Sequence, residues 1–354
     1  MGVERQRVYE ALGKVIDPEL RRPVTDLDMV RDVRVDGSDV EVTIALTVAG
    51  CPLRTSFQDQ VQEHVGRVPG VGRVALAFDV MTPEEKTALT ARLRGGISSR
   101  SKGISVDAAT RVIAIVSGKG GVGKSSLTVN LAAAFSQLGQ HAGILDADVY
   151  GHSIPHMLGI RQRPVVVDRM IVPPVAHDLH LMSIGFFLDD NQPLMWRGPM
   201  LHRALEQFLS DVHWPKLDVL LVDMPPGTGD VAISLGQLLP RAEVIVVTTP
   251  QPVAREVAVR AAQMAQKTNM RLLGIIENMT GPVFGSGAGE ALGRELRIPV
   301  LGRVPLDPRL REACDLAEPL VASDPNADAA RAIRAIAEAI GERSSSFRAL
   351  PLVS

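Results

Sequence analysis

The stretch Val116-Ser117-Gly118-Lys119-Gly120-Gly121-Val122-Gly123-Lys124-Ser125-Ser126 decides the fold. It contains the pattern G-x-x-x-x-G-K-[ST], whose glycines let successive backbone N–H groups turn toward an anion. An uninterrupted apolar strand is expected before it, at 111–117, and a helix after it, at 125–138. The dipole of that helix adds to the attraction for phosphate. Because the pattern has the strand and helix that a phosphate-binding loop requires, the sequence predicts that the phosphates of a nucleotide bind here.

Each residue of the loop has a predicted role in nucleotide binding. Lys124 is expected to reach the β- and γ-phosphates, and the Ser125 hydroxyl is expected to complete the coordination of Mg²⁺. The predicted binding residues of the loop are Gly118, Lys119, Gly120, Gly121, Val122, Gly123, Lys124 and Ser125.

Three aspartates are predicted at the ends of neighbouring strands. Asp146 and Asp148 follow the apolar strand at 142–145, and Asp223 follows the strand at 218–222. Ligands of open α/β sheets collect at the carboxyl ends of strands, so Asp146 and Asp223 are predicted to join Ser125 in the Mg²⁺ shell. After Asp223, the segment Met-Pro-Pro-Gly-Thr-Gly-Asp is expected to act as a switch, with the N–H of Gly227 approaching the γ-phosphate.

The predicted elements divide the chain into four parts. Residues 1–93 have the order α-β-β-α-β-α, which is typical of a small α+β domain. Residues 94–108 are rich in Gly, Ser and charge and are predicted to be a linker. Residues 109–342 alternate buried apolar strands with helices, which indicates an α/β domain with a mainly parallel sheet. Residues 343–354 are predicted to be a C-terminal tail.

Composition and charge narrow the function classes. The chain has 354 residues, of which 45% are hydrophobic and 22% charged, as expected for globular domains. Its net charge of −2 argues against a dedicated nucleic-acid binder. No apolar run is long enough to span a membrane, and the first twenty residues have no signal-peptide core. Two cysteines make no disulfide framework, so we expect a cytoplasmic protein. From the net charge and the short apolar runs, we expect no nucleic-acid or membrane partner.

Together these motifs resemble one family. Lys119 within K-G-G-x-G-K-S is similar to the deviant Walker A motif of the dimeric ParA/MinD-like P-loop ATPases. Within that group, the chain resembles the Mrp/ApbC-type iron–sulfur cluster carriers. The stretches that carry this resemblance are 146–159 (DADVYGHSIPHMLG), 195–200 (MWRGPM), 217–230 (LDVLLVDMPPGTGD), 248–254 (TTPQPVA), 276–279 (IENM) and 284–290 (FGSGAGE). The small domain resembles the one that precedes the ATPase in many bacterial Mrp proteins.

The resemblance implies roles for individual residues. Lys119 is expected to reach the nucleotide of a partner subunit, so the protein is expected to be a homodimer. With Lys124 it would neutralise charge on the transferred phosphoryl group, while Asp148 would orient the attacking water. Asp223 corresponds to the Walker B acid, and Asp146 supports the same segment as Asp148. For the base, Asn278 is expected to hydrogen-bond adenine, with Pro305 in the loop beside it.

The chain departs from this family at the cluster site. Mrp-type carriers usually have C-x-x-C before the FG-x-G-x-G-E stretch, where two subunits share a 4Fe-4S cluster. Here that interval is Thr280-Gly281-Pro282-Val283, and thiolates are the normal ligands of such clusters. Cys51 is a candidate ligand, because its predicted place at a strand-to-helix turn would lower its thiol pKa. The alternative is that Cys51 is a small buried residue with a purely structural role. For Cys314 this structural role is the favoured interpretation.

Three functions therefore remain open from the sequence. The first is an ATPase that binds iron–sulfur clusters and transfers them to apoproteins or assembly factors. The second is a ParA/MinD-like positioning ATPase, which would need a basic surface or a membrane-binding C-terminal helix. Residues 329–340 (AARAIRAIAEAI) are more typical of a helix packed on its own domain. The third is a scaffold or regulatory ATPase without direct cluster binding.

Overall fold

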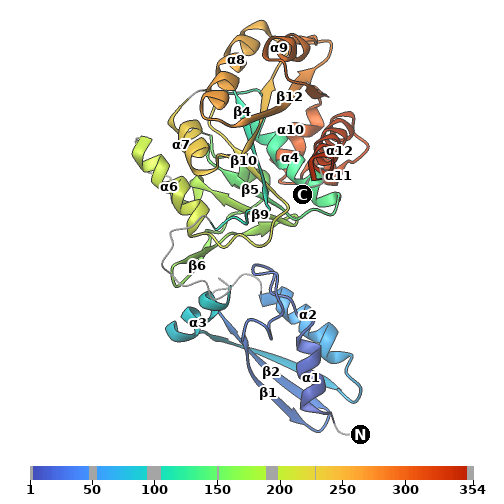
Figure 1. The fold of residues 1–354 in the computed structure, drawn as a ribbon. Coiled ribbons are helices and arrows are strands. Elements are labelled where there is room, and N and C mark those ends of the chain that lie inside the picture. Colours follow the sequence, from blue (N-terminus) through green and yellow to red (C-terminus); the bar gives the residue numbers. More distant parts are fainter. Residues whose placement is uncertain are drawn as a thin grey trace, which may run out of the picture. The chain divides into compact units, whose positions relative to one another are not determined.

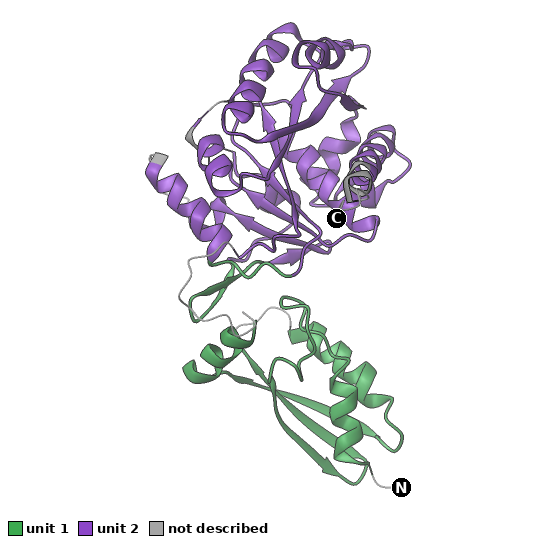
Figure 2. Ribbon diagram, viewed as in Figure 1, with its two compact units in different colours: residues 1–103, 164–173, 211–215 green, residues 104–163, 174–210, 216–354 purple. Residues whose placement is uncertain are grey.

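The computed structural model describes residues 3–47, 54–93, 105–149, 151–188, 198–227 and 229–348. The chain forms two compact units (Figure 2). The first unit comprises residues 1–103, 164–173 and 211–215, and the second comprises residues 104–163, 174–210 and 216–354. We predicted divisions near residues 93 and 109. Residues 164–173 and 211–215 belong to the first unit because they contact residues that are distant in sequence. No local sequence pattern indicates such contacts.

The first unit has the predicted α-β-β-α-β-α order (Figure 1). Its sheet has the strand order β1-β2-β3, with β1 and β2 antiparallel and β2 and β3 parallel. The turn predicted around Gly37 joins β1 to β2, and this glycine has a φ of 63° that side chains disfavour. The elements are α1 (Arg5–Leu12), β1 (Val30–Asp36), β2 (Asp39–Leu46), α2 (Arg54–Gly66), β3 (Arg73–Val80) and α3 (Pro83–Leu93).

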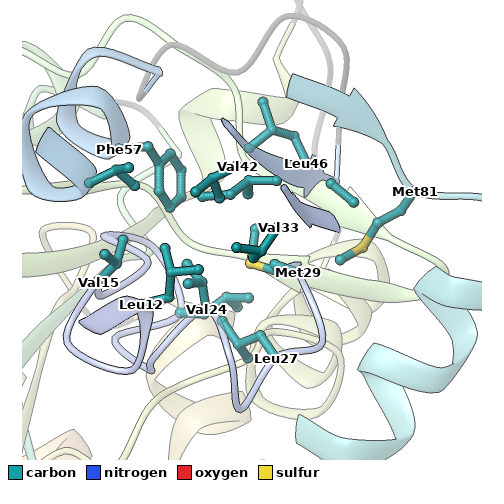
Figure 3. Close-up of a cluster of buried hydrophobic side chains, with 14 of the residues drawn as sticks. Leu12, Val15, Val24, Leu27, Met29, Val33, Val42, Leu46, Phe57 and Met81 are labelled. Carbon is teal, nitrogen blue, oxygen red and sulfur yellow. The ribbon is translucent and has the colours of Figure 1, made fainter. Parts of the chain in front are cut away.

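A single apolar cluster fills this unit (Figure 3). Helix and strand faces meet there because their apolar residues recur at the helical and strand periods. Strands β6 (Val165–Val167) and β7 (Met170–Val172) form a hairpin that adds Val167, Met170 and Val172 to the cluster. The Thr90 hydroxyl of α3 donates to the Val167 carbonyl at 3.3 Å. The labelled members of the cluster are Leu12, Val15, Val24, Leu27, Met29, Val33, Val42, Leu46, Phe57 and Met81.

The segment Asp17-Pro18-Glu19 places two carboxyl groups close to this core. Asp17 is 5% exposed, and one of its oxygens accepts the N–H groups of Glu19 and Leu20, each at 2.8 Å. Burial raises the pKa of Asp17. Burial also raises the pKa of Glu19 to about 7, and repulsion by the Asp17 carboxylate adds to this rise.

These shifts predict that the first unit loses stability as the pH rises. A carboxyl whose folded pKa is raised contributes stability below its unfolded pKa, near 4.5 for Glu19, and loses it as the pH rises through about 7. Glu19→Gln removes this charge, so it should stabilise the chain at pH 8, by at most about 3 kcal/mol, and change little at pH 4.5. Chemical unfolding at the two pH values measures the difference. Glu10→Gln, an exposed carboxyl on α1, is the matched control and should follow the parent at both.

The second unit contains the predicted mainly parallel sheet. Its eight strands have the order β13-β12-β11-β4-β10-β5-β9-β8, and only the short β8 is antiparallel to its neighbour. Strand β4 lies in the middle, so the loop that follows it emerges at the centre of the carboxyl edge. The strands are β4 (Arg111–Ser117), β5 (Ala142–Asp146), β8 (Val175–Ala176), β9 (Leu179–Ser183), β10 (Val219–Asp223), β11 (Glu243–Thr248), β12 (Arg271–Thr280) and β13 (Val300–Pro305).

Helices cover both faces of this sheet (Figure 1). Helix α4 packs with α5, α10, α11 and α12, whereas α8 packs with α7 and α9. A 3₁₀ turn, η1, covers Ile184–Phe187. The helices are α4 (Lys124–Gln137), α5 (Ile154–Met157), α6 (Gly198–Ser210), α7 (Asp230–Leu238), α8 (Pro252–Lys267), α9 (Ala288–Leu296), α10 (Pro308–Asp315), α11 (Leu320–Ser323) and α12 (Asp328–Arg348).

Helix α12 packs on its own domain, as its alanine-rich pattern indicated. Ala330, Ile333, Ala337 and Ile340 are all fully buried, and the helix contacts β13 and α4. Its apolar side is therefore unavailable to a membrane. The helix continues to Arg348, into the segment that we predicted to be a tail from residue 343.

Candidate nucleotide-binding site

The predicted phosphate loop joins β4 to α4, so both flanking elements are present. Gly118 must lack a side chain, because a Cβ there would lie 2.3 Å from the carbonyl carbon of Val257 in α8. Gly121 and Gly123 have φ values of 77° and 79°, a region that favours glycine. Added Cβ atoms at Gly120 and Gly121 would meet nothing within 4 Å, so this part of the loop borders open space.

Lys124 is the cation at the centre of the site. Its Nζ lies 2.7 Å from Asp223 Oδ2 and 3.3 Å from Asp148 Oδ2. The side chain is 6% exposed, and the Asp223 side chain is fully buried. A buried carboxylate needs such a partner, because an unpaired charge is expensive in a medium of low polarity. Asp148 and Asp223 follow Lys124 by 24 and 99 positions in sequence, and the structure brings all three together. Their meeting agrees with the expectation that side chains at the carboxyl ends of neighbouring strands lie close to one another.

Two hydroxyl groups complete the surroundings of Asp223. Ser125 Oγ donates to Asp223 Oδ2 at 2.6 Å, and Thr128 Oγ1 donates to Asp223 Oδ1 at 2.8 Å. Thr128 was missed in the sequence analysis. Its signal is its place one helical turn after Lys124, which puts both side chains on the face of α4 that borders β10.

Asp146 lies behind these residues. It is fully buried, and Oδ2 accepts the Ser183 hydroxyl at 2.8 Å while Oδ1 accepts the N–H of Asp148 at 3.2 Å. Burial raises the pKa of Asp146 to about 8, and repulsion by the Asp223 carboxylate adds to the rise. The Ser183 contact was also missed, because it depends on the pairing of β5 with β9.

The site has the oxygen donors that Mg²⁺ prefers. Asp223 and Ser125 place a carboxylate and a hydroxyl oxygen side by side, and Asp146 and Asp148 add two further carboxyl groups with Lys124 as the neighbouring ammonium. Hard oxygen ligands and an excess of negative charge fit a divalent cation bound with nucleotide phosphates. The residues therefore fit the predicted metal.

Gly227 contacts the end of β4, just before the loop, and Lys119 is the second residue of the loop. The N–H of Gly227, which has a φ of 96°, donates to the Ser117 carbonyl at 2.8 Å. The Lys119 carbonyl accepts the Ser117 hydroxyl at 3.0 Å. The side chain of Lys119 is half-buried, and its ammonium forms no hydrogen bond or ion pair within the described ranges.

The residues expected near the base lie at the ends of β12 and β13. Asn278 is 2% exposed, and its Nδ2 donates to the Val122 carbonyl of the phosphate loop at 2.8 Å. Pro305 is opposite Thr280 in the pairing of β12 and β13. The adenine contacts of both residues stay predictions.

The interval where the family usually has C-x-x-C forms a short turn. Gly281 and Gly285 exchange two backbone hydrogen bonds, of 3.0 and 2.7 Å, and Val283 between them is 71% exposed. Before this turn, the buried Glu277 accepts N–H groups from Gly287, Ala288 and Gly289 and so caps α9. The turn is therefore built without any cysteine.

Of the two cysteines, Cys314 is the one that the structure describes. Cys314 is buried in α10, as expected, and burial raises the pKa of its thiol, which disfavours a thiolate ligand. Cys51 lies outside the described residues. Within the part of the chain that the structure covers, no group of three or more His, Cys, Asp or Glu side chains could hold a metal by itself. The described residues also include no helix of the length and apolarity that crossing a bilayer requires.

The sheet, the loop and the buried Lys124 define the class of the protein, which is a P-loop NTPase of the ParA/MinD-like fold. MinD of Pyrococcus furiosus has the same fold, with a TM-score of 0.55 over 66% of this chain and 99% of its own. A nucleotide-binding protein from Archaeoglobus fulgidus, solved with ADP, superposes with a TM-score of 0.53 at 34% identity over 62% of this chain and 89% of its own. The predicted fold class is thus confirmed.

Sequence comparison then identifies the family. Residues 108–341 match the model of the NUBPL iron-transfer P-loop NTPases, and residues 5–76 match that of iron–sulfur cluster assembly proteins. The chain belongs to this family of iron-transfer P-loop NTPases. The iron–sulfur cluster carrier protein of Mycobacterium tuberculosis H37Rv is 49% identical over 98% of this chain and 95% of its own length. That of Bacillus subtilis is 38% identical over 86% and 88%. The predicted family is confirmed.

Proposed function

We propose that this protein is a homodimeric, Mg²⁺-dependent ATPase that carries iron–sulfur clusters to apoproteins. One observation carries the proposal: relatives over almost the whole chain, small domain included, are named iron–sulfur cluster carriers. The buried ionic site around Lys124 supports the ATPase part. The positioning alternative is not favoured, because α12 buries its apolar side within its own domain.

Hydrolysis in this proposal rests on positioning and charge. Lys124 leaves its bridge between Asp223 and Asp148 and binds the β- and γ-phosphates of ATP, close to its present position. Asp223 and Ser125 would hold Mg²⁺, which would offset charge on the phosphate oxygens. Asp148, released from Lys124, orients the water that attacks the γ-phosphate, and Ser183 and the N–H of Asp148 keep Asp146 in place behind it.

Cluster transfer in this proposal does not use the turn at Thr280–Val283. The cluster is cargo, and its ligands must be thiolates found elsewhere. Cys314 is buried and its thiol pKa is raised, so it is a poor source of a thiolate. The thiolate that this protein supplies to the cluster is therefore that of Cys51 in the small domain.

Anaerobic reconstitution with iron and sulfide tests the cluster part. We expect the parent chain to bind iron and to develop visible absorption, Cys51→Ala to lose both, and Cys314→Ala to keep both. ATP hydrolysis should be equal in the three proteins, which shows that the cysteine changes leave the second unit intact. A parent that binds no cluster would contradict the carrier function and leave a scaffold ATPase as the explanation. Equal loading of Cys51→Ala would contradict the assignment of Cys51.

A further inference from the structure

Asn278 contacts the phosphate loop at Val122 and Gly123, just before helix α4 begins. Its Nδ2 donates to the Val122 carbonyl at 2.8 Å, and the side chain is almost completely buried. A buried amide is held in one orientation by such a bond, because leaving the carbonyl unpaired would cost free energy. The bond therefore fixes the direction of the Val122 carbonyl.

The packing at Gly123 is equally close. A Cβ atom at this glycine would lie 2.4 Å from Asn278 Nδ2 and 3.4 Å from the terminal methyl carbon of Met279. Asn278 thus occupies the space that any side chain at position 123 would need. Gly123 also has a φ of 79°, a region that favours glycine, so both the backbone conformation and the position of Asn278 disfavour a side chain here.

The geometry of the peptide bond gives this contact a consequence for phosphate binding. In a trans peptide the C=O and the following N–H point in opposite directions, and the described chain has no cis peptide. Because Asn278 holds the Val122 carbonyl toward β12, the N–H of Gly123 points away from β12. Backbone N–H groups turned in this way are what a phosphate loop uses to bind its anion.

We propose that Asn278 is a positioning residue for phosphate binding, which acts by orienting the peptide between Val122 and Gly123. The inference rests on the proposed nucleotide binding and refines it. If Asn278 acts by orienting this peptide, its contribution to nucleotide affinity is independent of the base. If it contacts adenine instead, its contribution depends on the 6-amino group of the base. The two roles predict different responses to a change of nucleotide.

Binding of ATP and of inosine triphosphate, which has an oxygen in place of the 6-amino group, separates the roles. Asn278→Ala should weaken binding of both nucleotides by the same factor, of about tenfold for one buried hydrogen bond. Titration calorimetry measures both affinities. Thr280→Ala is the matched control, because it removes one side-chain bond to a backbone carbonyl from the same strand without touching the loop. It should leave both affinities unchanged.

A double substitution tests whether Asn278 acts through its contact with residues 122 and 123. Gly123→Ala should weaken binding of both nucleotides, since its methyl group collides with Asn278 and displaces it from the Val122 carbonyl. Adding Asn278→Ala to this variant should therefore cost much less than the loss of about tenfold that it causes in the parent. A further loss of about tenfold in the Gly123→Ala background overturns the inference.

The binding data also separate this inference from the proposed function. A parent that binds both nucleotides, with Asn278→Ala weakened for ATP alone, overturns the inference and leaves the ATPase function standing. A parent that binds neither nucleotide overturns the proposed function and this inference with it.

Discussion

Lys124→Ala is expected to abolish ATP hydrolysis and also to destabilise the second unit. The ammonium of Lys124 is the cation between Asp223 and Asp148, at 2.7 and 3.3 Å. Without it, nucleotide phosphates lose their main cationic partner in the loop. Among the described residues, the side chains that still donate to the fully buried Asp223 carboxylate are Ser125 and Thr128.

The expected loss of stability is large, because removing one partner of a buried ion pair leaves a buried charge without compensation. Such changes cost about 3–5 kcal/mol. Denaturant unfolding of the nucleotide-free chain measures the free energy of unfolding, and phosphate release measures turnover. Because no nucleotide is present in the unfolding experiment, lost ligand binding cannot explain a decrease.

A double variant separates the two effects of this substitution. In Lys124→Ala/Asp223→Asn the carboxylate charge is removed together with its partner. Stability should therefore recover toward that of the parent, while hydrolysis stays absent. If Lys124→Ala unfolds at the parental denaturant concentration, the lysine does not stabilise the nucleotide-free fold and this account of the site is wrong.

The sequence predicted the elements of the site more completely than its inner contacts. Buried strands of a parallel sheet are unbroken apolar runs, so β4 and β10 were identified directly, and with them Asp223 at a strand end. Thr128 and Ser183 were not, because their hydrogen bonds depend on how α4 and β9 pack beside β10 and β5. Local periodicity does not encode such pairings between distant elements.

The same reason explains the unit boundaries and the role of Asn278. The hairpin of β6 and β7 lies far from residues 1–103 in sequence, and only packing assigns it to the first unit. Asn278 was assigned to adenine by family resemblance. Its contact with Val122 depends on a close approach of β12 to the loop, which the glycine at position 123 permits but does not by itself reveal.

Lys119→Ala is expected to keep nucleotide binding and to lose most of its turnover. Unlike Lys124, Lys119 is half-buried, and its ammonium has no hydrogen-bond or ion-pair partner among the residues that the structure describes. Removing it should therefore leave the free energy of unfolding unchanged. Cationic groups supplied in trans to phosphoryl transfer are worth roughly 10³-fold or more in rate, so a loss of about that size is expected. ADP titration and phosphate release measure the two properties.

Mixed dimers decide whether Lys119 acts on its own nucleotide or on that of its partner. Asp148→Asn is expected to be inactive by itself, because its water is not oriented, but it still carries Lys119. If the lysine acts across the interface, mixing it with Lys119→Ala creates one complete site: the Lys119→Ala subunit keeps Asp148 and receives the lysine of its partner. Turnover should then reappear on mixing two inactive proteins. A lysine that acts within its own site cannot be replaced by that of a neighbour. A mixture that stays inactive although the subunits exchange would therefore contradict the action of Lys119 on the partner's nucleotide. A Lys119→Ala chain with parental turnover would contradict it as well.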